Sequence, residues 1–160
     1  MCIRDRPEFG LLFPLRRELT EVSYLGLGPR ETTADRTAGG KMGAWSYNVR
    51  QDFAQNTPVY PQECGSRTGV YRAAVTGSGL NIGIGFAGDS MTFSALPYTP
   101  HELENARHLY ELPRDDNKTV VRCAAFQRGV GGDNSWGAKP HADDCFAVEK
   151  GTSFRFTIQK

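Results

Sequence analysis

A glycine-rich loop near the C-terminus carries the side chain with the clearest capacity to bind a ligand, Trp136. The loop spans residues 128–137 and reads Arg-Gly-Val-Gly-Gly-Asp-Asn-Ser-Trp-Gly. Glycine, aspartate and asparagine favour tight turns, so this stretch continues neither a strand nor a helix. An indole held out on such a loop is a flat aromatic platform, which suits the apolar face of a sugar. The alternative is that Trp136 folds back and covers the edge of the protein core.

The other reactive side chains do not form a recognisable catalytic set. Glu63, Glu102, Glu104 and Glu111 are candidates for the pair of carboxylates that glycoside hydrolysis requires. A helix cap explains Glu102, however, and Glu111 falls at a solvent-facing position of a predicted strand. The three histidines are scattered along the chain, and no serine or cysteine motif resembles a nucleophile elbow. We therefore expect no catalytic residue in this chain.

The sequence also contains no pattern typical of a metal or phosphate site. Asp143 and Asp144 lack the spacing of a calcium-binding loop and indicate a solvated turn. No glycine-rich segment leads into a helix that carries lysine, which a phosphate cradle would require. The cysteines form no short-spaced pair, so we expect reduced, mostly buried thiols, with a disulfide as the alternative. These cysteines are Cys2, Cys64, Cys123 and Cys145. We expect no metal ion and no cofactor in this chain.

Composition indicates one globular domain. The chain has 160 residues, and the balance of 39% hydrophobic and 23% charged residues is ordinary for a soluble protein. Its net charge of +1 argues against a nucleic acid or an anionic membrane as the main partner. No apolar run approaches the length of a transmembrane helix, and the first residues do not resemble a signal peptide. We expect a cytoplasmic location.

Alternating apolar and polar or small residues predict a series of short antiparallel strands. In residues 80–87, Leu80, Ile82, Ile84 and Phe86 would share one buried face. Further strands are predicted at 70–75, 108–112, 119–124 and 154–159, with a hairpin connection at 76–79. One short helix is predicted near 99–106, where Thr99-Pro100-His101-Glu102 forms a capping box with proline at the first helical position. The pattern predicts an all-β antiparallel sandwich.

The first residues do not continue this pattern. The segment Met-Cys-Ile-Arg-Asp-Arg at 1–6 has no periodicity and resembles a translated sequencing-adapter leader. The alternative is a genuine disordered N-terminus. In either case we set residues 1–10 apart from the domain, which we expect to span residues 11–160.

Four separate motifs resemble, in order and spacing, the last domain of the large β-galactosidases of glycoside hydrolase family 2. They are Tyr-Leu-Gly-Leu-Gly-Pro-Arg-Glu at 24–31 with Asp-Arg at 35–36, Pro-Val-Tyr-Pro-Gln-Glu-Cys-Gly-Ser-Arg at 58–67, Thr-Phe-Ser-Ala-Leu-Pro-Tyr at 92–98, and Gly-Gly-Asp-Asn-Ser-Trp at 131–136. The resemblance extends from about residue 18 to the C-terminus. The chain departs from the family at Cys64, where asparagine is common, and across residues 38–52.

The resemblance implies a fold and a division of labour. The chain would be the C-terminal half of the small-chain domain, domain 5, an antiparallel β-sandwich of the galactose-mutarotase-like supersandwich type. The catalytic acid and the nucleophile would be two glutamates on a separate (β/α)8 barrel. The loop would reach the mouth of the active site, where Trp136 would stack on sugar. The residues that shape the loop would be Gly131, Gly132, Asp133, Asn134 and Ser135.

The resemblance also implies a substrate and partners. The substrate would be a β-galactoside such as lactose, which loses its terminal β-D-galactose. The partners would be the remaining domains or large chain of the enzyme, and the intact enzyme would be a homo-oligomer. Mg and Na, which complete enzymes of the family use, would be bound outside this chain. Two alternatives stay open: a free-standing carbohydrate-binding module, and a structural domain that supports assembly, with Trp136 as a packing residue.

Overall fold

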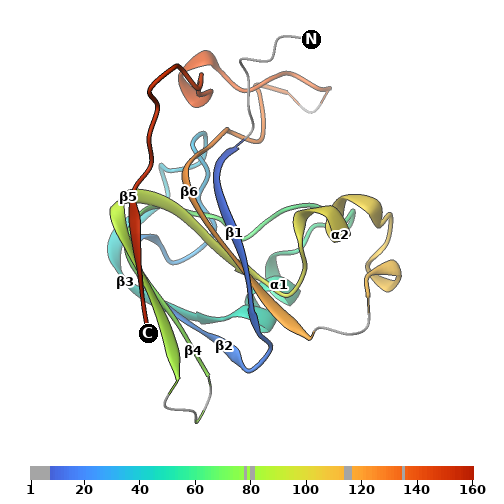
Figure 1. Cartoon of the computed structure of the whole chain (residues 1–160). Coiled ribbons are helices and arrows are strands. Elements are labelled where there is room, and N and C mark those ends of the chain that lie inside the picture. Colours follow the sequence, from blue (N-terminus) through green and yellow to red (C-terminus); the bar gives the residue numbers. More distant parts are fainter. Residues whose placement is uncertain (1–7, 78, 80–81, 114–116, 135) are drawn as a thin grey trace.

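The computed structural model describes residues 8–77, 79, 82–113, 117–134 and 136–160 (Figure 1). Residues 1–7, which make up most of the predicted leader, lie outside the described residues, as do Leu80 and Ser135. Residues 8–10, which the sequence led us to set apart with the leader, belong to the first strand of the sheet. In that strand Glu8 pairs with Gln127, and Phe9 pairs with Phe126.

Within the described residues, seven antiparallel strands form one hydrogen-bonded sheet, with the order β1-β6-β5-β4-β2-β3 and with β7 paired to β5. The strands are β1 (Glu8–Arg16), β2 (Leu19–Gly28), β3 (Lys41–Asn48), β4 (Arg67–Gly77), β5 (Gly83–Leu96), β6 (Lys118–Gln127) and β7 (Phe156–Gln159). The sheet curls until β1 faces β5 and β7 across the core. The Phe13 ring of β1 lies 6.1 Å from that of Phe86 and 6.0 Å from that of Phe156. The expected all-β antiparallel class is confirmed, and the facing layers belong to one continuous sheet.

Strand β5 connects the two parts of the curled sheet. Its first half pairs with β7 at residues 85–88, and its second half pairs with β6 at residues 92–96. Between these halves the register with β4 shifts from Val70↔Met91 to Arg72↔Ala87, and Ser90 adopts a positive φ of 52°. Extra residues in one strand of a pair form a bulge, which bends that strand. The bulge therefore lets one long strand serve both parts of the sheet.

The core follows from this curvature. One apolar cluster lies inside the curl and includes Val22, Val75, Met91, Phe93 and Val121. A second, smaller cluster lies on the opposite face of β5, where two helices cover it. These helices are α1 (Val49–Asn56) and α2 (Pro100–Asn105). Residues 91–96 of β5 are consequently buried on both faces. This explains why the segment contains only apolar and small residues and does not alternate with charged ones.

The structure confirms several predicted elements and corrects others. The predicted strands at 70–75 and 119–124 lie within β4 and β6, and the capped helix is α2. The strand predicted at 80–87 begins at Gly83, and the last strand begins at Phe156. The strand predicted at 108–112 is wrong, because Leu109–Glu111 forms a 3-10 helix, η1. The cause is Glu111, whose carboxylate accepts the backbone N–H of Arg107 at 2.7 Å and thereby caps a helical turn.

Two further findings concern the expected chemistry of the chain. Among the described cysteines, Cys64, Cys123 and Cys145 are free thiols. Burial raises the pKa of Cys64 and of Cys123 to about 12, so both stay protonated at neutral pH. In the parts of the chain that the structure describes, no helix has the length and apolar character needed to cross a membrane.

A buried ion pair joins α1 to the start of β4. The Arg67 guanidinium donates to both carboxylate oxygens of Asp52, at 2.7 and 3.0 Å, and to the carbonyl oxygen of Gly65 at 2.7 Å. The same guanidinium lies 4.4 Å from the centre of the Tyr47 ring. The side chain of Arg67 is 1% exposed and that of Asp52 is 10% exposed. If one partner is removed, water therefore cannot solvate the charge that remains.

We predict that Arg67→Met destabilises the protein strongly, because it leaves the Asp52 carboxylate buried without a cation. The free energy of unfolding should fall by about 3–5 kcal/mol, measured by urea denaturation followed by circular dichroism. The matched control is Arg16→Met, whose ion pair with Glu18 joins side chains that are 77% and 45% exposed. That variant should change the free energy of unfolding by less than about 1 kcal/mol. Equal losses in the two variants would contradict this account.

Candidate functional site

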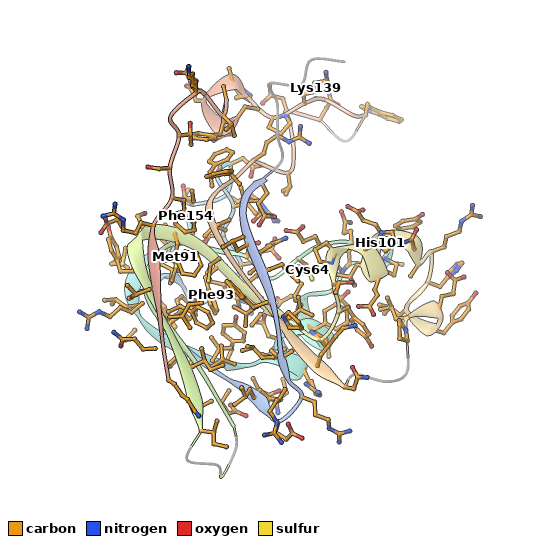
Figure 2. The ribbon with its side chains drawn as sticks, viewed as in Figure 1. Cys64, Met91, Phe93, His101, Lys139 and Phe154 are labelled. Carbon is orange, nitrogen blue, oxygen red and sulfur yellow. The ribbon has the colours of Figure 1, made fainter. Side chains whose placement is uncertain are left out.

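The loop that carries Trp136 lies at one end of the sheet, opposite the β4–β5 hairpin (Figure 1). It follows β6 and leads into the 3-10 helix η2 (Ala142–Asp144). The Trp136 side chain is 92% exposed, so the indole does not fold back onto the core of this chain. Lys139, in the same connection between β6 and η2, lies far from His101 of α2 (Figure 2). The loop thus presents a large aromatic surface at a place separate from the two helices.

Hydrogen bonds inside the loop determine the backbone around the indole. The Asn134 Oδ1 atom accepts the backbone N–H of Trp136 at 2.8 Å, which forms a tight turn immediately before the ring. Asp133 pairs with a side chain rather than with the backbone, because its Oδ1 lies 2.8 Å from Nε2 of His141. Ser135, the remaining polar residue of the predicted set, lies outside the described residues.

The two sequential glycines of the loop have different surroundings. At Gly132 a Cβ atom would lie 2.5 Å from the carbonyl oxygen of Lys139, which is closer than real contacts allow. The two arms of the loop therefore approach each other closely only because residue 132 has no side chain. At Gly131 a Cβ would meet Asp35 Oδ2 at 3.9 Å, which is an ordinary contact. Among these two glycines, Gly132 is the one that the loop geometry requires.

A carboxylate from a distant part of the chain holds the start of the loop. Asp35 Oδ2 accepts the backbone N–H groups of Val130 at 3.0 Å and Gly131 at 2.9 Å. Its other oxygen, Oδ1, accepts the hydroxyl of Thr33 at 2.6 Å. Burial opposes the charged form of Asp35, but these bonds outweigh it and lower the pKa of Asp35. Asp35 belongs to one of the four sequence motifs, but the sequence alone does not predict its contact with the loop.

The segment around Asp35 is itself attached to the start of β4. Thr32 donates its N–H to the carbonyl oxygen of Ser66 at 2.9 Å, and its hydroxyl accepts the N–H of Thr68 at 2.9 Å. Glu31 accepts the N–H of Gly65 at 2.6 Å. The side chains of Thr32 and Thr33 are buried, although they belong to a connection between strands. The loop therefore rests on a connection that is firmly bonded to the sheet.

The candidate carboxylates occupy separate structural contacts. Glu63 pairs with the buried Arg122 and accepts a hydrogen bond from Gln127. Glu102 caps α2 through Thr99 and pairs with Lys118, while Glu111 caps η1, and Glu104 is exposed on α2. Glu63, Glu102 and Glu111 thus each have their own partners and do not share one. Within the described residues, no three histidine, cysteine, aspartate or glutamate side chains gather as a metal site.

A hollow in the surface lies away from the Trp136 loop. It is a trough of about 730 Å³ across β3, β2, β4, β5 and β7. Its lining includes the small residues Ser23, Ala44, Ala74 and Gly85. None of the residues predicted from the sequence to bind sugar lines this trough. The aromatic loop and the trough are therefore separate features of the surface.

We predict that the pair formed by Asp133 and His141 is pH-sensitive. The hydrogen bond and the negative charge of Asp133 raise the pKa of His141 above its ordinary value of 6.5. A raised pKa means that the pair stabilises the loop fully below the ordinary value and that this effect is lost as pH rises through the raised value. A ¹H–¹⁵N NMR titration of the imidazole should show this pKa, and Asp133→Asn should lower it. Asp89→Asn, at an exposed position on β5, is the control and should leave the titration unchanged.

Comparison with known proteins agrees with the motifs. The family model described as "Beta galactosidase small chain" matches residues 3–158. A β-galactosidase of Lactobacillus delbrueckii subsp. bulgaricus is 39% identical over 155 residues, which cover 96% of this chain and 15% of that protein. A β-galactosidase of Halalkalibacterium halodurans is 36% identical over 155 residues, with the same coverage. A β-galactosidase small subunit of Latilactobacillus sakei is 38% identical over 143 residues, which cover 82% of this chain and 43% of that subunit.

The matched lengths show what kind of relationship this is. The chain spans 15% of the length of the first two relatives and less than half of the small subunit. The similarity therefore concerns one part of a larger enzyme or one part of its smaller subunit. Because the family model matches nearly the whole sequence, this chain belongs to the β-galactosidase small-chain family.

Proposed function

We propose that this chain is a working part of a family 2 β-galactosidase and presents Trp136 to the galactoside in the active site. The observation that carries the proposal is the 92% exposed indole on a loop whose start is bonded to Asp35 and whose backbone turns at Asn134. An exposed tryptophan at the end of a mobile tail would lose much of its binding energy in ordering the tail. A ring on a pre-bonded loop avoids that loss.

The chemistry of the reaction assigns this chain a positioning task. Retaining hydrolysis uses two carboxyl groups about 5 Å apart, one as nucleophile and one as proton donor. Glu63, Glu102 and Glu111 are engaged in separate caps and ion pairs, and Glu104 is exposed on α2. We therefore assign both catalytic groups to the remaining domains. The indole face of Trp136 packs against the C–H side of a pyranose and orients the sugar for attack. Those domains, on one chain or on a separate large chain, are the proposed partners.

The same reasoning applies to metal ions. Complete enzymes of the family use Mg and Na, but the described residues contain no cluster of the kind that would hold such an ion. We therefore assign these ions to the other domains and give them no role in this chain. The reaction that we propose for the whole enzyme is the release of terminal β-D-galactose from β-galactosides such as lactose.

We predict that Trp136→Leu in the complete enzyme weakens substrate binding more than it slows the chemical step. The loss should be about 1–3 kcal/mol, seen as a raised KM with a smaller change in kcat. Trp136→Phe should retain part of the affinity, because a phenyl ring is flat but smaller. The matched control is Tyr110→Leu, which removes a 78% exposed aromatic ring from η1. That variant should leave KM unchanged.

Steady-state kinetics and thermal unfolding of the same preparations distinguish the alternatives. A pure structural role for Trp136 predicts a lower melting temperature together with normal galactoside binding, and that result would refute the proposed site. A free-standing carbohydrate-binding module predicts that the 160-residue chain binds galactose without any other domain. Titration of the indole fluorescence with galactose tests this second alternative.

We also predict that the 160-residue chain alone hydrolyses no galactoside, because its carboxylates do not converge. The measurement is the release of nitrophenol from a nitrophenyl β-galactoside by the purified chain. The control is the complete enzyme assayed at the same molar concentration. Turnover by the chain that disappears in Glu63→Gln or Glu104→Gln would contradict the assignment of the catalytic groups to other domains.

A further inference from the structure

We propose that Asp35 is the positioning residue of the Trp136 loop and acts on substrate binding through that loop alone. The inference rests on the proposed function of Trp136. Asp35 is separated from Val130 and Gly131 by 95 and 96 positions in the sequence, yet one of its oxygens accepts both of their N–H groups. Two successive N–H groups that converge on one anionic oxygen form a small anion-binding nest. Here a side chain of the same protein occupies that nest.

The packing around the contact allows little displacement. At Gly129 a Cβ atom would lie 2.9 Å from Cγ of Asp35 and 3.1 Å from Cβ of Asp144. A side chain at position 129 would thus collide with both aspartates, and the Gly129 N–H donates to the carbonyl oxygen of Asp144 at 2.9 Å. Any larger residue at position 129 would push the loop away from Asp35. The loop base is therefore held by two separate contacts, one with Asp35 and one with Asp144 of η2.

Asp35 is suited to this task because other side chains of the connection 31–36 fix its carboxylate. The Thr33 hydroxyl donates to Asp35 Oδ1 and accepts from Nε of Arg36 at 3.2 Å, while Arg36 also pairs with Glu31. Glu31 in turn bonds to the backbone of Gly65 beside β4. This series of bonds connects the sheet to the carboxylate and the carboxylate to the loop. The position of the loop base is thus transmitted from the sheet through side chains rather than along the chain.

The geometry also separates Asp35 from a role in direct sugar binding. Both of its oxygens already accept hydrogen bonds, one from a hydroxyl and one from two backbone N–H groups. Trp136 lies five residues beyond Gly131, with the Asn134 turn and the close approach at Gly132 between them. A shift at residues 130–131 therefore also displaces Gly132 and the Asn134 turn, which precede the indole. A misplaced aromatic platform loses affinity even when its own chemistry is intact.

The test is a double-mutant cycle in the complete enzyme that joins Asp35→Ala with Trp136→Leu. Asp35→Ala alone should raise KM for a nitrophenyl β-galactoside by about three- to tenfold, the effect of losing about one hydrogen bond of typical net strength, with kcat changed less than about twofold. Asp35→Asn keeps an oxygen that can accept the two N–H groups, so it should restore most of the affinity. In the Trp136→Leu background, Asp35→Ala should change KM by less than about twofold, because its route to the substrate is gone.

The controls separate this inference from its premise and from a folding defect. Asp89→Ala removes an exposed aspartate from β5 and should leave KM and the melting temperature unchanged. If Trp136→Leu raises KM and Asp35→Ala does not, the positioning role is refuted and the proposed function of Trp136 stands. If Asp35→Ala raises KM equally with and without Trp136, Asp35 acts by another route and the inference fails. If Trp136→Leu leaves KM unchanged, the proposed function of Trp136 is refuted, and this inference is refuted with it because it depends on that function.

Discussion

The buried ion pair between Arg67 and Asp52 is the contact on which the arrangement around the loop depends. It fixes α1 against the first residue of β4 and, through the carbonyl oxygen of Gly65, the segment that enters that strand. Burial disfavours the charge of Arg67, but the bonds to Asp52 and the Tyr47 ring outweigh this effect and raise the pKa of Arg67. The guanidinium therefore remains charged at neutral pH, where it donates to the Asp52 carboxylate.

The connection 31–36 uses this fixed segment as its support. Its hydrogen bonds reach Gly65, Ser66 and Thr68, all beside or within the first residues of β4. From there Asp35 reaches the glycine-rich loop. A buried charge pair in the sheet is thus connected to an exposed indole by hydrogen bonds, and neither apolar cluster includes a described residue of the loop 128–137. This arrangement suits a binding platform, because a core beneath the indole would bury the surface that must contact the ligand.

Several acidic residues of the chain likewise serve structural contacts. Glu102 and Glu111 cap short helices, Glu63 neutralises the buried Arg122, and Asp35 holds the loop. Each carboxylate is positioned by a hydrogen bond or ion pair near its own segment of the backbone. These segments lie in different parts of the structure. A pair of carboxylates facing one sugar would need the opposite arrangement, with two side chains directed at a shared space. These separate contacts support the proposed positioning role of the chain, which is similar to a small part of larger β-galactosidases.

The sequence by itself determined the features that depend on neighbours along the chain. The alternation at 70–75 and 119–124 predicted β4 and β6, and the capping box at Thr99 predicted α2, because strand faces and caps are decided within a few residues. The four spaced motifs likewise placed the chain in its family. Local patterns failed where a side chain decided the outcome: Glu111 caps a 3-10 turn at a place that alternation assigned to a strand, and the Asn48 cap that begins α1 was missed. The tertiary structure alone brought Asp35 to Val130, across 95 residues of sequence, because only the folded sheet holds those two connections side by side.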